Sequence, residues 1–185
     1  SISWVWLASL LIQFGSNYSL NRWIPIAIEN NDRSLLSSRL KSTLLTSLGL
    51  YLFLCMLLSL IAHWFDHELG FGFVLFLVWI GLASIQITIA EIFRSFSIFS
   101  LATLMSGPLA QFITLTLGFI FFFQKKILNI ETLVILTIIG LFVSSVYGAI
   151  RLYPQVKKFW SPTRINWKGK WSGHFDFFLV NIFLY

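Results

Sequence analysis

Bulky polar side chains occur at helical spacing inside the most apolar parts of this chain. Within residues 2–28 a polar residue recurs at every fourth position, which places all four on one face of a helix: Ser9, Gln13, Asn17 and Asn21. Arg22 follows directly. Polar groups in an apolar helix usually face a protein interior or a water-filled cavity. We therefore expect these amides and this guanidinium to line a hydrophilic cavity.

Three further apolar stretches each have one polar or small face. These faces comprise Ser84, Thr88, Glu91 and Ser95; then Ser100, Thr103, Gly107, Gln111, Thr114 and Gly118; then Thr137, Gly140, Ser144, Gly148 and Arg151. For the small residues the alternative is close helix packing with interhelical hydrogen bonds, and we favour it. Glu91 and Gln111 are bulkier than packing requires, so for them we favour the cavity. Pro108 is expected to kink its helix.

Two arginines could recognise an anion at the mouth of such a cavity. A guanidinium binds phosphate through paired donors and keeps its charge, so Arg22 and Arg94 suit a diphosphate group. Each has a simpler alternative. Arg22 could be an anchor whose charge reaches the membrane surface. Arg94 could pair with Glu91, which precedes it by three residues.

Catalytic motifs are missing from the sequence, so we expect no enzyme, no catalytic residue, no metal and no cofactor. The chain has no HExxH, GxSxG, P-loop or GxGxxG pattern. A weak metal site remains an alternative where four potential ligands lie close together: His63, Asp66, His67 and Glu68. Cys55 is the only cysteine and is expected to be a packing residue.

Composition indicates a polytopic all-α membrane bundle. The chain is 57% hydrophobic and only 11% charged, whereas about a quarter of a soluble domain is charged. Five stretches are long enough to cross a bilayer, namely about 2–28, 44–65 (with an amphipathic lead-in from 34), 71–92, 98–123 and 130–152. A sixth begins near 175 and is incomplete. We interpret the chain as an internal fragment of a longer protein.

The charges predict an orientation. Eleven of the thirteen basic residues fall in the connections after the first, third and fifth stretches, which places those connections in the cytoplasm. The same pattern excludes nucleic acid as a partner, because the positive charges alternate with apolar spans. We expect a bundle at 1–152, a basic cytoplasmic linker at 153–173 that touches anionic lipid, and the start of another span at 174–185.

The segment GSNYSLNRWIPIAIENND and the following LLSSRLKSTLLTSLGLYLF resemble the second and third helices of polysaccharide and O-antigen flippases. These belong to the multidrug/oligosaccharidyl-lipid/polysaccharide exporter superfamily. Gly15, Arg22 and the acidic turn at 29–32 match its pattern. Two later segments, IAEIFRSFSIFSLATLMSGPLAQFI and VYGAIRLYPQV, resemble its fourth to sixth helices.

The resemblance implies the first lobe of a two-lobe transporter, with five full spans and one truncated span. It also implies export of polyprenyl-diphosphate-linked oligosaccharide across the cytoplasmic (inner) membrane for surface polysaccharide or lipopolysaccharide, with H⁺ or Na⁺ as a coupling ion. On that hypothesis Arg22 and Arg94 attract the diphosphate, and Gln13, Asn17, Asn21 and Gln111 line the path for sugar hydroxyls. Two alternatives stay open: a drug or metabolite antiporter of the same superfamily, and a membrane-bound glycosyl- or acyltransferase.

Overall fold

The computed structural model describes residues 2–13, 16–64, 70–124 and 129–159. Within those ranges the chain is helical, has no strand and forms seven helices: α1 (Ile2–Gln13), α2 (Ser16–Glu29), α3 (Arg33–Trp64), α4 (Phe71–Ser95), α5 (Phe99–Met105), α6 (Pro108–Phe123) and α7 (Ile130–Phe159). The prediction of an all-α bundle is therefore confirmed for the described residues.

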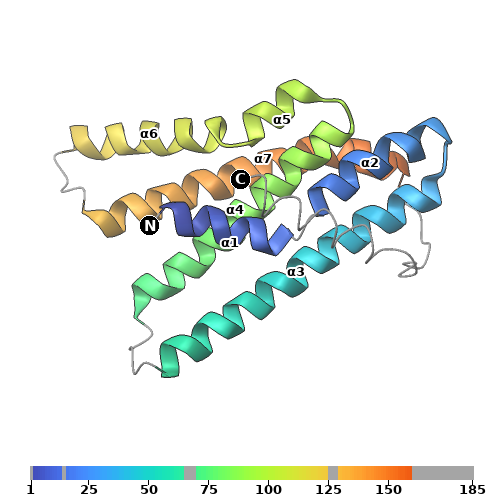
Figure 1. Cartoon of the computed structure of the whole chain (residues 1–185). Helices are drawn as coiled ribbons and strands as arrows, with labels where there is room; N and C mark the ends of the chain where they lie inside the picture. The colour runs from blue at the N-terminus through green and yellow to red at the C-terminus, as the bar shows by residue number, and fades with distance from the viewer. Residues whose placement is uncertain (1, 14–15, 65–69, 125–128, 160–185) are drawn as a thin grey trace.

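Helix α4 is the centre of the bundle. It packs against α7 most extensively and also contacts α5, α1 and α2. Helix α6 lies along α7 at one edge, and α3 lies at the opposite edge, where its main neighbours are α2 and α1 (Figure 1). Although α3 and α4 are consecutive long helices, they share few contacts, because α1 packs against both.

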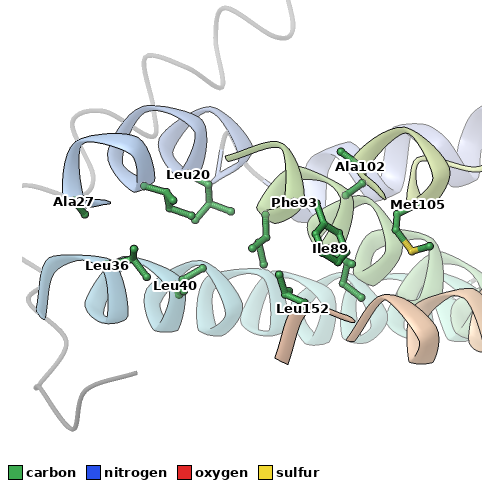
Figure 2. Packing of buried hydrophobic residues seen from close by; sticks show 12 residues of the cluster. Leu20, Ala27, Leu36, Leu40, Ile89, Phe93, Ala102, Met105 and Leu152 are labelled. Atoms are coloured by element: carbon green, nitrogen blue, oxygen red, sulfur yellow. The ribbon is translucent and has the colours of Figure 1, made fainter. Parts of the chain in front are cut away.

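The main core lies where α2, α3, α4, α5 and α7 meet. Its buried members include Leu20, Leu40, Phe93, Met105 and Leu152, which converge in Figure 2. Phe93 is fully buried (0% exposed) and is the largest of the fully buried side chains. Because five helices contribute to this cluster, it fixes the position of one end of α4, where the polar residues Glu91, Arg94 and Ser95 also lie.

A capped turn connects α2 to α3. Asn31 has a left-handed backbone (φ 50°), a conformation that asparagine tolerates better than most residues. Asp32 then accepts hydrogen bonds from the Leu35 backbone N–H (2.9 Å) and the Ser34 hydroxyl (2.8 Å). These bonds cap the helix and lower the pKa of the Asp32 carboxyl below its ordinary value, with the Leu35 bond as the largest cause.

The stretch expected as one span at 98–123 is divided in two. Helices α5 and α6 meet at an angle of 43°. Gly107 has φ 151°, a conformation that side chains disfavour, and Pro108 begins α6 at a position where its missing N–H costs nothing. The predicted kink at Pro108 is thus present, as a break in which Ser106 and Gly107 separate the two helices.

Three of the helices are long and apolar enough to cross a membrane, namely α3, α4 and α7, and a fourth span results if α5 and α6 count as one. Many large apolar side chains on these helices are exposed, including Leu52, Phe53 and Met56 on α3. Such surfaces are compatible with a membrane protein.

Two expectations about span limits differ from the structure. The first expected span, 2–28, contains two helices, α1 and α2, and neither is among the helices long and apolar enough to cross a membrane. The count of five spans therefore remains a prediction. Helix α7 continues to Phe159 with Pro154 inside it, so the first part of the expected linker at 153–173 is helical. The rest of that linker and the stretch at 174–185 lie outside the described residues.

Candidate functional site

A polar cluster joins α2 to α4 at the end of α4. Asn21 donates a hydrogen bond from Nδ2 to Oε2 of Glu91 (2.9 Å), and its Oδ1 accepts one from the Ser95 hydroxyl (2.7 Å). The other carboxylate oxygen of Glu91 forms an ion pair with Arg94. Asn21, Glu91, Arg94 and Ser95 thus form one connected polar cluster, of which the Glu91 side chain is largely buried (12% exposed).

This geometry decides between two interpretations of Arg94. The structure shows the pairing with Glu91, one turn earlier on the same helix. A paired guanidinium offers less net charge to an incoming anion than a free one. Arg94 therefore contributes to the cluster chiefly by neutralising Glu91, which makes it a weaker anion-binding candidate than the sequence suggested.

Arg22 lies outside this cluster and contacts an aromatic ring instead. Its guanidinium carbon is 5.4 Å from the centroid of the Trp23 ring, and that of Arg39, on α3, is 4.6 Å from the same ring. Neither arginine forms an ion pair with any carboxylate of the described residues. The two cations repel each other, and each is attracted to the ring face, but a neutral indole does not cancel either charge, so neither arginine is neutralised by these contacts.

Sequence reasoning assigned Arg39 only to the topology and missed its place beside Arg22. The two residues are far apart in the chain and meet because α2 packs antiparallel against the first turns of α3. We define Arg22, Trp23 and Arg39 as the arginine–tryptophan cluster. No periodicity in the sequence could have identified it, because it depends on the register between two helices.

The remaining candidates for the cavity are in separate places. Gln13 is buried (2% exposed) at the end of α1. The side chain of Asn17 lies outside what the structure describes. Gln111 is exposed on α6 and lines a cavity of about 450 Å³ between α1, α4, α6 and α7. The structure therefore brings Asn21 and Glu91 together, whereas Gln111 lines a cavity to which neither of them contributes.

The 450 Å³ cavity lies beside the break between α5 and α6. Ser106 and Gly107 line it together with Gln86, Gln111 and Thr137. Polar residues from three helices thus line one space; of these, the sequence analysis assigned only Gln111 to a cavity. Broken helices next to a partly polar cavity are a recurrent feature of transporter sites.

Gln86 was missed by the sequence reasoning. It is buried (3% exposed) on α4 and donates a hydrogen bond from Nε2 to the backbone carbonyl of Met105 (2.8 Å), with the Ser144 hydroxyl 3.4 Å away. Met105 ends α5, so its carbonyl lacks the amide partner that a continuing helix would supply. A signal existed, because a glutamine in the middle of an apolar stretch needs a partner.

Two glycines on the polar face of α7 serve packing. A Cβ placed on Gly140 would lie 2.7 Å from the Ala110 carbonyl oxygen, so only glycine permits this contact between α6 and α7. At Gly148 it would lie 2.8 Å from both Ile89 and Met105. Ser84 and Thr88 donate to carbonyls of their own helix. The packing alternative is therefore supported at Gly140 and Gly148, whereas the hydroxyls of Ser84 and Thr88 are satisfied within α4.

No metal-binding group of three or more His, Cys, Asp or Glu residues occurs in the described ranges. Of the four residues in the weak metal site considered above, His63 is exposed at the end of α3, while Asp66, His67 and Glu68 lie outside the described residues. That alternative stays a prediction.

Comparison with known proteins adds no assignment. No protein family, no curated protein and no solved structure matches this chain.

Proposed function

We propose that this chain is part of a membrane transporter that moves polyprenyl-diphosphate-linked oligosaccharide across the cytoplasmic membrane. The observation that most supports this is the arginine–tryptophan cluster. Arg22 and Arg39 have no carboxylate partner among the described residues, and the charge pattern assigns their end of the bundle to the cytoplasm, where such a substrate is made. Paired guanidinium groups are suited to a diphosphate.

The cavity beside the helix break provides the second element of the proposal. Gln111 supplies an exposed amide at its wall, and amides are suited to sugar hydroxyls because each can both donate and accept hydrogen bonds. Asn21 is less available for this task, since both of its amide atoms are engaged by Glu91 and Ser95. The chain would supply one lobe of a two-lobe transporter, in which the lobes rock around the shared site, with H⁺ or Na⁺ as the coupling ion.

The test is Arg22→Ala in cells that depend on the transporter for surface polysaccharide. Losing one charge-assisted interaction with phosphate, worth about 1.5–3 kcal/mol, lowers binding by at least about tenfold. Surface polymer should therefore fall while the amount of protein in the membrane stays the same. Arg33→Ala is the matched control, because Arg33 is exposed at the start of α3 and does not contact the Trp23 ring.

Arg22→Lys separates charge from geometry. A lysine retains the positive charge but lacks the planar pair of donors, so partial activity is expected. Polymer levels that are unchanged in Arg22→Ala, or reduced equally by Arg33→Ala, would remove Arg22 from the mechanism.

A second candidate function, ion-coupled antiport of a drug or metabolite, is favoured by one observation. Glu91 is a largely buried carboxylate that joins two helices. An antiporter that used it for coupling would lose activity in Glu91→Gln. A flippase that relies on the arginine–tryptophan cluster would retain transport in that variant, because the amide can still accept a hydrogen bond from Asn21. The position of Glu91 near a helix end and its pairing with Arg94 make this candidate the weaker one.

A further inference from the structure

Helices α5 and α6 differ in how firmly they are held. Helix α5 contributes Ala102 and Met105 to the main core, and both are buried (1% and 0% exposed). Its last carbonyl, on Met105, also accepts the hydrogen bond from Gln86 of α4. Among the residues of α6, all of which the structure describes, only Ala110 is buried. Helix α5 is thus fixed to α4, whereas most of α6 lies outside the core and packs mainly along α7 (Figure 1).

The backbone between these two helices is free to rotate without losing the hydrogen bonds on either side. The Ser106 N–H donates back to the Ala102 carbonyl (3.0 Å), and the Gln111 N–H donates to the Gly107 carbonyl (3.0 Å). Neither bond crosses the peptide bond between Ser106 and Gly107, and Pro108 has no N–H to donate. Gly107 has φ 151°, a value that glycine adopts readily and that side chains disfavour. A change in φ at Gly107 therefore moves α6 as a unit and breaks neither bond.

Helix α6 forms one wall of the 450 Å³ cavity. Four residues in its first two turns line that cavity, namely Ala110, Gln111, Thr114 and Leu115. Helix α6 is also in close contact with α7 at Gly140, where an added Cβ would lie 2.7 Å from the Ala110 carbonyl oxygen. This contact lies one turn from Gly107, so it is close to the axis of any rotation there and is displaced little. A rotation at Gly107 thus changes the width of the cavity, while the wall that belongs to α4 stays in place.

We propose that α6 is a gate of the 450 Å³ cavity and that Gly107 is its hinge. Hinges are commonly a few residues at the ends of helices that absorb a change in backbone angle. The structure shows the position of α6 in which the cavity is present and Gly107 has a positive φ. In the second position Gly107 has a negative φ and α6 leans toward α4, which closes the cavity. The proposal rests on the helix break and its contacts, and it holds whichever molecule enters the cavity.

The experiment uses the full chain in lipid nanodiscs, with its only cysteine removed by Cys55→Ser and spin labels attached to two introduced cysteines. One pair, Val78→Cys with Phe119→Cys, joins α4 to α6. The matched pair, Val78→Cys with Ile139→Cys, joins α4 to α7. All three labelled positions are exposed and none lines the cavity. Pulsed electron–electron double resonance gives the distribution of distances for each pair.

Two populations of distance are expected for the pair between α4 and α6. One population is expected for the pair between α4 and α7, because these helices share the most extensive interface. Gly107→Ala should reduce the longer-distance population at least about fivefold relative to the shorter one, because alanine is strained at φ 151°. Gly118→Ala is the matched control within α6: an added Cβ there meets nothing within 4 Å, so the two populations should not change.

Three results would overturn the proposal. A single narrow distribution for the pair between α4 and α6 would show that the break is a fixed kink. Equally broad distributions for both pairs would place the movement in α4 or throughout the bundle. Two populations whose ratio is unchanged by Gly107→Ala would separate the movement from the hinge. The first two comparisons leave Gly107 in place, so they decide the question even when Gly107→Ala does not fold.

Discussion

Replacing Gln86 with leucine tests whether its amide holds the break between α5 and α6. The substitution keeps the side chain at similar size but removes the donor that lies 2.8 Å from the Met105 carbonyl. Hydrogen bonds between membrane helices contribute on average about 0.6 and at most about 1.7 kcal/mol. A buried carbonyl left without a partner costs about 1–3 kcal/mol. We therefore expect a loss of about 1.5–2 kcal/mol in the free energy of unfolding.

The contact with Ser144 is expected to contribute little of this, because its 3.4 Å separation exceeds the usual range of about 2.7–3.2 Å. Ser144→Ala should therefore cost less than about 0.5 kcal/mol. Equilibrium unfolding in mixed detergent micelles gives the free energy of unfolding of the unsubstituted protein, Gln86→Leu and Ser144→Ala. Gln111→Leu is the control for the same chemical change, since Gln111 is exposed and no other described residue accepts a hydrogen bond from its side chain. Equal losses for Gln86→Leu and Gln111→Leu would refute the reasoning.

Two further predictions concern the packing of α6 on α7 and the cap of α3. Gly140→Ala should destabilise the protein by about 1–3 kcal/mol, because the added methyl group would clash with the Ala110 carbonyl; Gly118→Ala, with open space around it, should be neutral or slightly stabilising in the same thermal unfolding assay. The pKa of Asp32 is lower in the folded protein than its ordinary value of 3.8. The ionised carboxylate therefore stabilises the fold fully at pH values well above 3.8, and this stabilisation is lost as the pH falls through the folded-state pKa. Asp32→Ala should remove this acid dependence of unfolding, and an unchanged pH profile would contradict the role of the cap at Leu35.

Much of the helical framework could be predicted because it depends on local patterns. The apolar stretches at 71–92 and 98–123 correspond to α4 and to α5 with α6, and Pro108 marked the break. The end of α7 could not be predicted, because Pro154 usually ends a helix and here lies inside one. Val156, two residues after Pro154, packs against the main core, and this contact favours continuing the helix beyond the proline.

The candidate site was predictable only in part. Spacing within one helix correctly indicated that Glu91 and Arg94 could pair, since residues three apart are neighbours on a helix. The meeting of Arg22 with Arg39 depends on how α2 packs against α3, and sequence spacing contains no information on that register. The same holds for Gln86, whose partner belongs to a helix end nineteen positions further along the chain.

The position of α1 has a consequence for the order in which the protein is assembled. Its partners on both sides, α3 and α4, are synthesised after it, and α4 receives its largest interface only when α7 is complete. In the membrane transporter proposed above, the early helices would be synthesised before most of their neighbours exist. An intermediate that holds α1 and α2 without α4 would leave Asn21 without the partners that satisfy it. We expect such intermediates to depend on the insertion machinery or a membrane chaperone, and to be a preferred target of quality-control proteases when synthesis stops before α7.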